Sequence, residues 1–462
     1  SQAGAIAAII YDNVPGAMGS MAVENYTIPA AFVTKASGEK LLSAETKEAS
    51  FSKDYYGKSP SPVANQMSSF SSWGPGNELT IKPEITAPGG NIYSSVIGGG
   101  YAVSSGTSMA TPHMAAAAAL VRQYLQGKLG LSGKELGELA NTLMMGTAKV
   151  AMDDNTGLPF SPRRQGAGVV DLEKAMTAEA YVTVDGCNRP KAEVGSSEVG
   201  RYQFDLTVHS WADHVRTYSL RTDVCTEAIV EQSGLYFAAE EEQDLSQYVS
   251  VSYEGLTQNL LVVPAGGVAK VTVTVILTDA GKAYLESYFK NGCYIEGFTY
   301  LVAEDETGVS LNVPFLGFYG DWDNLDAVED FKDGVYNVAP TMFMNINDSR
   351  RGYYMGLNTY SNNIDYGKLS FSNVVNGNDR KLIAQASLLR NCKHLDAKVT
   401  DSNGNIVWSW DFGDEFRKSF YYASYGSVLT TTLEKGWDGR MPESGDRAPE
   451  GWYTYTLSAL PC

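Results

Sequence analysis

The sequence predicts a multidomain protein in which an α/β segment is followed by two all-β segments. Two helical stretches, at residues 111–128 and 133–145, lie in the first half, whereas strict alternation of polar and apolar residues begins only after Ala180. Alternation with a period of two is typical of half-buried strands. A chain of 462 residues is also long enough to build several cores.

Four segments follow from this pattern. Apolar positions alternate at residues 202–208 and 271–277, and the same pattern returns at residues 397–410 and 452–457, so two β-sandwiches are the natural interpretation. The expected boundaries are 1–59 for strands with a helix at 37–43, 60–180 for the α/β segment, 181–323 for the first sandwich and 324–462 for the second.

Composition excludes several function classes. The formal net charge of −18 and pI of about 4.7 argue against a nucleic-acid surface, which needs basic patches to neutralise phosphates. No apolar run approaches the roughly 20 residues that cross a bilayer. The five cysteines are scattered without metal-site spacing, and their pairing cannot be deduced from the sequence. The acidic run Glu240-Glu241-Glu242 is expected to be a solvated face.

The most informative motif is Gly-Thr-Ser-Met-Ala-Thr-Pro-His at residues 106–113, followed by an apolar run. It places Ser108 at the entrance of the helix expected over residues 111–128, where unpaired N–H groups and the helix dipole favour the oxygen that becomes negative during acyl transfer. Gly106 lets a substrate backbone approach, and Pro112 costs little if it is early in the helix. The alanines that follow suit a closely packed, buried helix. The alternative is that Thr107 or Ser108 is merely an N-cap.

The context of this motif favours the nucleophile. Ser-Ser-Phe-Ser-Ser-Trp-Gly-Pro lies at residues 68–75, Lys-Pro-Glu-Ile-Thr-Ala-Pro-Gly at 82–89, and Gly-Gly-Gly-Tyr at 98–101, a turn expected before the nucleophile. This order and spacing resemble the subtilisin-like serine peptidases, and Gly-Ala-Gly-Val-Val-Asp at 166–171 resembles the end of their catalytic domain.

The flanking residues narrow the resemblance to one branch of that family. Residues 3–10 and 28–33 resemble the last strands of an inserted protease-associated β domain. Residues 296–298 and 313–322 resemble the fibronectin-like domain of lactocepins and streptococcal complement-cleaving peptidases of the cell envelope. The resemblance therefore implies the C-terminal part of an α/β subtilisin-like catalytic domain with a protease-associated remnant, followed by two fibronectin-like sandwiches.

The resemblance also assigns roles. It implies a serine endopeptidase that forms an acyl-enzyme on Ser108, whose backbone N–H contributes to the oxyanion hole, with Gly106, Thr107 and Phe70 binding the substrate. His113 matches a family histidine that is not the base and is expected to be packed and satisfied. His209, His214 and His394 are expected to be surface or turn residues, since none has the family's histidine motif around it.

The catalytic histidine, aspartate and oxyanion-hole asparagine of the family have no counterpart here. The chain is therefore interpreted as the C-terminal portion of a larger enzyme, inactive alone, whose partners are the missing N-terminal half and a protein or peptide substrate. The opening Ser-Gln-Ala-Gly, without a leader, fits that interpretation. The implied location is extracellular, secreted or attached to the cell wall, with no membrane span. The alternative function is a non-catalytic cell-surface binding protein with a vestigial protease segment.

No cofactor is expected to be required. Five carboxylates are candidate ligands for a structural calcium ion, but their spacing matches no EF-hand loop, so the metal stays open. These residues are Asp321, Asp323, Asp326, Glu329 and Asp330.

Overall fold

The structure is a computed structural model of the chain. It describes residues 5–11, 28, 30–46, 48, 63–232, 235–305, 307–322, 325–329, 342–347, 352–358, 363–375, 377–422 and 427–461. The chain divides into two compact units, Ser1–Met67 and Ser68–Cys462. In the first unit, β1 (Ala8–Tyr11) pairs in parallel with β2 (Ala30–Val33), and Thr34 caps α1 (Lys35–Ser43) by accepting a hydrogen bond from the Ser37 amide.

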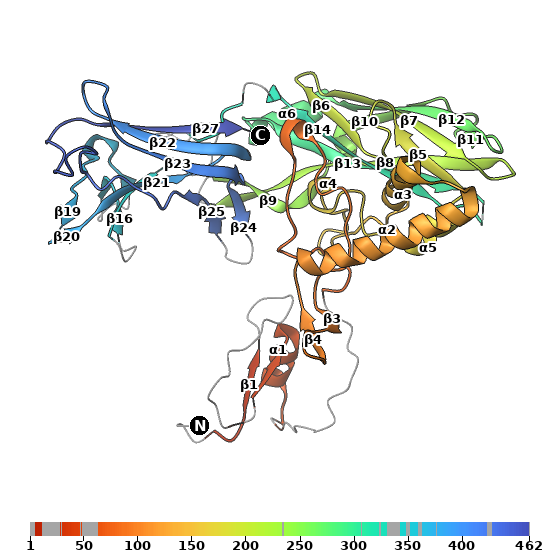
Figure 1. Cartoon of the computed structure of the whole chain (residues 1–462), viewed down its shortest axis with the longest axis horizontal. Coiled ribbons are helices and arrows are strands. Elements are labelled where there is room, and N and C mark those ends of the chain that lie inside the picture. The colour runs from red at the N-terminus through yellow and green to blue at the C-terminus, as the bar shows by residue number, and fades with distance from the viewer. Residues whose placement is uncertain are drawn as a thin grey trace. The chain divides into compact units, whose positions relative to one another are not determined.

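The second unit begins with the α/β segment (Figure 1). Its elements are η1 (Asn77–Leu79), the hairpin of β3 (Ile92–Ser95) and β4 (Tyr101–Ser104), α2 (Thr107–Leu129), α3 (Gly133–Gly146), α4 (Pro162–Gln165) and α5 (Leu172–Thr177). Ala117, Val121 and Leu125 of α2 are four residues apart, so they form one stripe, which packs on a core that includes Leu136 and Leu143 of α3. This core holds the long helix in place.

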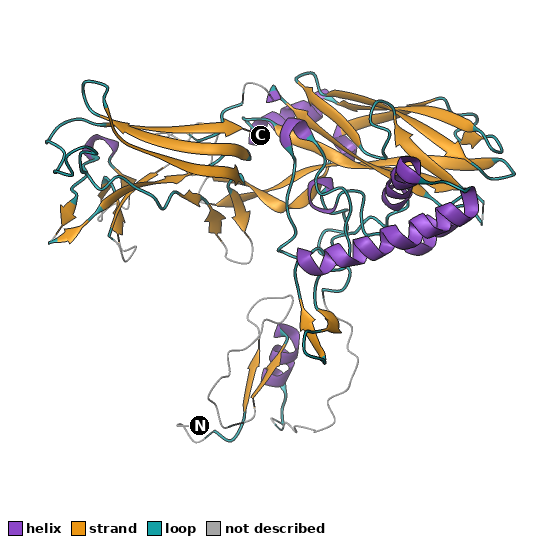
Figure 2. Ribbon diagram, viewed as in Figure 1, coloured by secondary structure: helices purple, strands orange, loops and turns teal. Residues whose placement is uncertain are grey.

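The β-rich architecture predicted after Ala180 is confirmed (Figure 2). One four-stranded sheet has the order β10-β12-β7-β5, and a second sheet has the order β11-β8-β13-β14-β6, with β9 paired to β8. Their side chains share one apolar core. The bounds are β5 (Ala180–Val184), β6 (Ala192–Ser197), β7 (Arg201–Ser210), β8 (Arg216–Gln232), β9 (Leu235–Asp244), η2 (Ser246–Tyr248), β10 (Val249–Glu254), β11 (Leu261–Val263), β12 (Val268–Leu277), α6 (Asp279–Tyr288), β13 (Cys293–Ala303) and β14 (Leu311–Tyr319).

The remaining strands form smaller sheets, of which the largest have the orders β16-β15-β21-β26 and β23-β22-β27. The bounds are β15 (Met342–Ile346), β16 (Gly352–Tyr354), β17 (Leu357–Asn358), β18 (Asn363–Ile364), η4 (Tyr366–Lys368), β19 (Val374–Val375), β20 (Asn378–Asp379), β21 (Lys381–Ala386), β22 (Cys392–Thr400), β23 (Ile406–Phe416), β24 (Phe420–Tyr422), β25 (Ser427–Leu429), β26 (Thr431–Thr432) and β27 (Thr454–Pro461). Within the described residues, no helix has the length and apolar character needed to span a membrane.

Strand β14 is buried along its whole length because both of its faces are covered. One face contributes Val313 and Phe315 to the core between the two sheets, and the other contributes Leu316 and Phe318 to a cluster with Ile81 of the α/β segment. Coverage on both faces explains why the strand alternates so little between polar and apolar residues. The α/β segment therefore packs directly on the sheet that contains β13 and β14.

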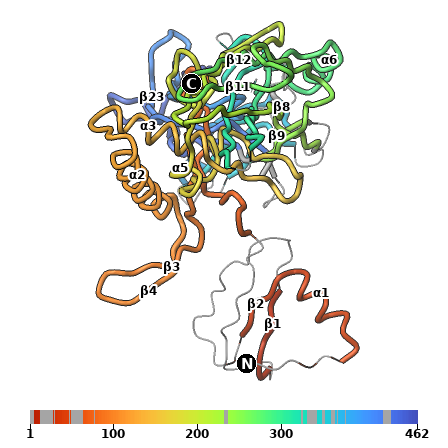
Figure 3. The backbone as a smooth tube through the Cα atoms, turned by 90° about the vertical axis from the view of Figure 1, so that its right-hand side faces the viewer, coloured from red at the N-terminus to blue at the C-terminus, as the bar shows by residue number. Residues whose placement is uncertain are grey.

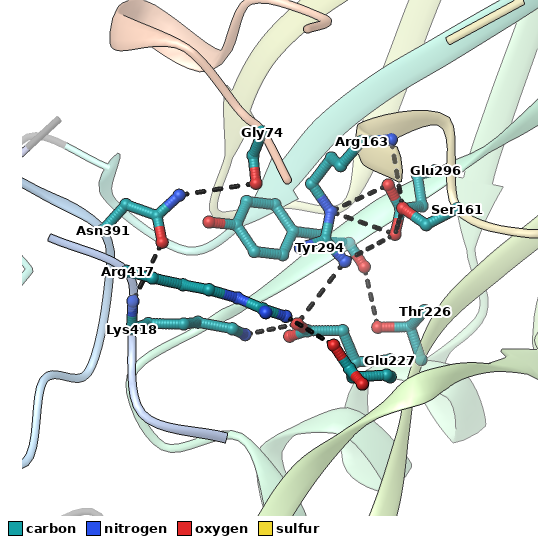
Figure 4. A network of polar contacts seen from close by, with 11 residues as sticks. Gly74, Ser161, Arg163, Thr226, Glu227, Tyr294, Glu296, Asn391, Arg417 and Lys418 are labelled. Atoms are coloured by element: carbon teal, nitrogen blue, oxygen red, sulfur yellow. Dashed lines mark hydrogen bonds and ion pairs between the residues drawn. The ribbon is translucent and has the colours of Figure 1, made fainter. Parts of the chain in front are cut away.

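A buried group of charges lies at this junction (Figure 4). Arg163 of α4 is 2% exposed, and its Nη2 donates to Glu296 Oε1 of β13 at 2.7 Å and lies 3.4 Å from Glu227 Oε1 of β8. Lys418 also ion-pairs with Glu227, and Arg417 ion-pairs with Glu240 at 3.1 Å. Burial alone would raise the pKa of Glu227, but Lys418 and Arg163 outweigh it and hold that pKa below its usual value. We call these residues, together with Glu242, the junction cluster.

The expectation that residues 240–242 form a solvated face is wrong for two of the three. Glu241 is exposed, but Glu242 is buried and Glu240 is largely covered because strand β9 directs both toward the junction cluster. Burial raises the pKa of Glu242 well above 4.5, and the neighbouring carboxylate of Glu296 adds to the shift. With Glu242 protonated, three cations (Arg163, Arg417 and Lys418) balance three carboxylates (Glu227, Glu240 and Glu296).

A Glu242→Gln variant is expected to flatten the dependence of stability on pH. In the wild type, the folded state keeps the Glu242 proton while the unfolded state loses it near pH 4.5, so the contribution to stability falls as pH rises toward the raised folded pKa. Glutamine resembles the protonated acid and does not titrate. Urea unfolding at pH 5 and pH 8 should show a smaller loss in the variant, whereas Glu241→Gln should retain the wild-type loss. Equal losses in all three proteins would contradict the assignment.

Candidate active site

Ser108 is the second residue of α2 and is exposed. The hairpin of β3 and β4 leads directly into this helix (Figure 3). The carbonyl of Gly106 accepts hydrogen bonds from the amides of Met109 at 3.0 Å and Ala110 at 3.4 Å. Among the described residues, no acceptor lies within bonding distance of the Ser108 amide or hydroxyl. An unpaired first-turn N–H beside a free hydroxyl is the local arrangement that acyl transfer requires.

The predicted start of this helix at Thr111 is wrong, because α2 begins at Thr107. Pro112 is therefore the sixth helical residue rather than one of the first, and its missing N–H leaves the Ser108 carbonyl without the usual donor four residues on. Proline signals an early helix position in sequence reasoning, but here it follows a full turn. The shift places Ser108 inside the first turn, where its amide is unpaired.

The prediction of a buried helix after the nucleophile is also wrong for most of its residues. Within residues 115–119 only Ala117 is buried, and the next residue, Leu120, is 45% exposed. The single stripe that packs on α3 covers one side of the helix, and no described residue covers the other. An apolar helix of this kind is normally buried on more than one side.

Of the other predicted site residues, Gly106 and Thr107 lie at the helix entrance, and Phe70 lies in a separate turn. Thr107 is exposed, Gly106 is partly exposed, and the Gly106 amide donates to the Gly89 carbonyl at 2.9 Å. Phe70 is 45% exposed in a turn closed by the hydrogen bond from the Ser71 amide to the Ser68 carbonyl at 2.9 Å. Their roles in substrate binding stay predictions.

The structure brings no histidine to Ser108. His113 is exposed rather than packed, and its Nδ1 lies 3.0 Å from the Met109 carbonyl oxygen of the preceding turn. His209 is the last residue but one of β7 and stacks on Tyr181 at 4.7 Å between ring centroids, so it is not a turn residue. Burial lowers its pKa. His214 is exposed beside Asp213.

His394 lies on β22 and contacts Asp414 at 2.7 Å and Asp411 at 3.3 Å. The hydrogen bond to Asp414 raises the pKa of His394, and the nearby aspartates add to the shift. This histidine therefore carries a local ion pair and has no contact with the nucleophile.

The candidate calcium ligands are only partly described. Asp323 and Asp330 lie outside the described residues, and the described part of the chain contains no group of three or more histidine, cysteine or acidic side chains placed to hold a metal ion. Calcium therefore stays a prediction. Cys187, Cys225, Cys293 and Cys392 are free thiols.

The sequence did not indicate a role for Gly89 or Arg163. The structure places Gly89 against Gly106 and Arg163 against Gly74. A Cβ on Gly89 would stand 2.8 Å from the Gly106 carbonyl oxygen, so glycine is needed for the backbone of the nucleophile loop to lie against it. Gly89 lies near Ser108 only because of the fold, so no local sequence pattern predicts this contact. Fully buried arginines are rare, so nothing in the local sequence singles out Arg163 as a buried residue.

Comparison with known proteins places these features in a family. Residues 5–168 match the subtilase family and residues 195–316 match an Fn3-like domain. The chain is 27% identical to the C5a peptidase of Streptococcus pyogenes over 525 residues, a match that covers all of this chain and 43% of that protein.

The chain is also 29% identical to the PII-type proteinase of Lactococcus lactis subsp. cremoris over 426 residues, covering 86% of this chain and 21% of that protein. The PII-type proteinase of Lacticaseibacillus paracasei is 29% identical over 424 residues with the same coverage. The chain thus spans less than half the length of these relatives. Ser108 and its helix lie within residues 5–168, the part of the chain that matches the subtilase family of serine peptidases.

Proposed function

We propose that this chain carries the nucleophile of a serine endopeptidase that cleaves extracellular proteins. The observation that carries the proposal is the geometry at Ser108: an exposed hydroxyl in the first turn of α2, beside its own unpaired amide. Ser108 Oγ would form a bond to the peptide carbonyl carbon while its proton passes to a base. The amide of Ser108 would then donate to the oxyanion, a type of contact that contributes about 10²–10³ in kcat.

The remaining catalytic groups would come from outside these 462 residues. A histidine would accept the serine proton and return it to the leaving amine, an aspartate would orient that histidine, and an asparagine would complete the oxyanion hole. Water would then hydrolyse the acyl-enzyme. The uncovered side of α2 supports this proposal, because a second body that brings the base would also bury the exposed alanines and Leu120.

The substrate assignment follows from the relatives, which are named as peptidases and proteinases. Gly106, Thr107 and Phe70 would line the substrate, with Phe70 on the leaving-group side. The proposed location is extracellular, either secreted or bound to the cell wall. The proposed domains keep the boundaries 1–59 for the end of a protease-associated insert, 60–180 for the catalytic segment, and 181–323 and 324–462 for two fibronectin-like sandwiches.

Labelling tests the proposal. The chain, supplied with the histidine-bearing portion, is treated with a fluorophosphonate probe and digested, and the modified peptide is sequenced by mass spectrometry. We expect the label on Ser108, its loss in Ser108→Ala and its retention in Ser105→Ala, since the Ser105 hydroxyl is already bonded to the Asn91 amide at 2.8 Å. No label in the completed protein would favour a non-catalytic surface binding protein.

Gly89→Ala is expected to slow labelling of Ser108 about 10–100-fold, the usual consequence of displacing a reacting group by roughly 1 Å. The new methyl group would stand 2.8 Å from the Gly106 carbonyl oxygen and 3.1 Å from Ala110 Cβ, so the nucleophile loop must move. Gly90→Ala is the matched control, because its methyl group meets only the Ser68 hydroxyl at 3.2 Å, which can rotate away. Rates that are equal in the two variants would argue against this packing.

A further inference from the structure

The segment at residues 68–74 is tied to helix α4. The Gly74 amide donates to the Arg163 carbonyl at 2.7 Å, and Arg164 Nη2 donates to the Ser68 carbonyl at 3.2 Å. The Ser71 hydroxyl donates to the Arg164 carbonyl at 3.4 Å. Two consecutive arginines of a single turn therefore hold both ends of this segment.

The same segment reaches the nucleophile through two glycines. The Ser68 hydroxyl lies 3.2 Å from the position that a Cβ on Gly90 would occupy, so Ser68 lies beside Gly90. The neighbouring Gly89 accepts the hydrogen bond from the Gly106 amide at 2.9 Å. A shift of residues 68–74 would therefore displace Gly89 and Gly90, and with them Gly106, two residues before Ser108.

The position of α4 is set by the downstream domains rather than by the α/β segment alone (Figure 4). Arg163 binds Glu296 through Nε and Nη2, and the Ser161 hydroxyl that caps α4 also donates to Glu296, at 2.9 Å. On the other side, the Asn391 amide donates to the Gly74 carbonyl at 3.4 Å and accepts from the Lys418 backbone amide at 3.0 Å. Both ends of the contact between Gly74 and Arg163 are thus held by residues far along the chain.

Aromatic stacking strengthens the same connection. The guanidinium carbons of Arg163, Arg164 and Arg417 lie 5.5, 5.2 and 4.9 Å from the centre of the Trp73 ring, and Arg163 lies 3.9 Å from the ring of Tyr294. Contacts of this kind are stronger when they are shielded from water, as they are at this junction. The Trp73 ring therefore contacts arginines from both the α/β segment and the C-terminal segment.

We propose that Arg163 is a positioning residue for Ser108: through Glu296 and Gly74 it transmits the fixed geometry of the downstream sheets to the loop that aims the nucleophile. The proposal rests on the proposed function only for its catalytic consequence. Its mechanical part, that Arg163 orders residues 68–74 and the helix entrance, concerns this chain alone.

Arg216 provides the matched control. It is also buried and also joins the two parts, since it ion-pairs with Glu179 at 2.5 Å and with Asp305, but none of its contacts involves residues 68–74. Arg163→Met leaves the buried carboxylates of Glu296 and Glu227 without this partner, whereas Arg216→Met affects Glu179 and Asp305, which are 33% exposed, so Arg216→Met should destabilise the protein less. A purely structural role would make the two variants behave alike at the nucleophile.

The first test is amide hydrogen exchange on this chain, read under conditions in which each variant stays folded. We expect Arg163→Met to raise the exchange rates of residues 68–74 and 106–110 at least tenfold over Arg216→Met, and Arg163→Lys to raise them less. Glu296→Gln, which keeps the shape of the acceptor, provides a second variant should Arg163→Met fail to fold. Equal exchange in the Arg163 and Arg216 variants would overturn the proposal.

The second test uses the completed enzyme. Arg163→Met should lower kcat about 10–100-fold with a smaller change in KM, as expected for a misaimed nucleophile, and Arg163→Lys should restore part of it. Arg216→Met should keep kcat per labelled active site within about twofold of the wild type. Failure of the wild type itself to label would defeat the proposed function and leave hydrogen exchange to decide this one. A labelled wild type with equal kcat losses in both arginine variants would defeat the positioning role alone.

Discussion

Fluorophosphonate labelling of Ser108 in the isolated chain is expected to be about 10⁵–10⁶ times slower than in the chain completed with a histidine-bearing portion. No described histidine contacts Ser108, so its hydroxyl stays protonated and weakly nucleophilic. In subtilisin, a member of the family that residues 5–168 match, loss of the serine or the histidine costs about 2 × 10⁶ in kcat. The asparagine donor of the proposed oxyanion hole would be absent as well, but losses within one catalytic group are not additive, so the expected effect stays close to that of losing the base alone.

The measurement is the second-order labelling rate of each preparation, with Ser108→Ala as the blank. The exposed His113 is the natural control for an unrecognised base, so His113→Ala should leave the rate of the isolated chain unchanged. Fast labelling of the isolated chain that disappears in His113→Ala would show that the base lies within these residues.

Gly166→Ala is expected to lower the free energy of unfolding by about 2–5 kcal/mol. Gly166 ends α4 with φ of +63° and ψ of −131°, a backbone region outside the left-handed helix that costs other residues about 1–2 kcal/mol or more. A Cβ there would also stand 2.2 Å from the carbonyl carbon of Glu84, and such overpacking costs about 1–3 kcal/mol more. Urea unfolding followed by tryptophan fluorescence measures the loss.

Gly157→Ala separates the two causes. Gly157 has φ of +71° but nothing within 4 Å of its Cβ position, so it should lose only the conformational part, about 1–2 kcal/mol. If both variants lost the same amount, the collision with Glu84 would be absent and the contact between α4 and the segment at residue 84 would have to be redrawn.

Ser108 could be proposed as the nucleophile from the sequence because the signal is local. Residues 106–113 combine a flexible glycine, a serine and an apolar helix within one turn, and Ser108 does lie in the first turn of α2. The strands after Ala180 could also be predicted, because alternation of polar and apolar residues with a period of two indicates a sheet with one buried face. The helix start was missed because Pro112 is a stronger start signal than the residues that precede it.

The support behind the nucleophile could not be read from the sequence because it depends on distant partners. Arg163 looks like a surface residue until Glu296, more than a hundred positions later, is placed against it. Glu242 belongs to an acidic run whose usual meaning is solvation, and only the pairing of β9 with β8 turns it inward. Tertiary packing decides whether such residues are buried, and local composition does not predict that packing.

The junction cluster also bears on the order in which the protein folds. Its hydrogen bonds join residues separated by 133 positions between Arg163 and Glu296 and by 191 between Lys418 and Glu227, and the nearby bond between Asn391 and Gly74 spans 317 positions. Contacts of such long range form slowly. Closing the large loops between them costs conformational entropy before the contacts themselves can stabilise the chain. A chain emerging from the ribosome cannot form the bond between Lys418 and Glu227 until residue 418 has been synthesised. If Arg163 positions Ser108 as proposed, the loop that carries Ser108 reaches its final geometry only after the chain up to residue 418 has been made, so the rate of translation limits how early that loop can become ordered.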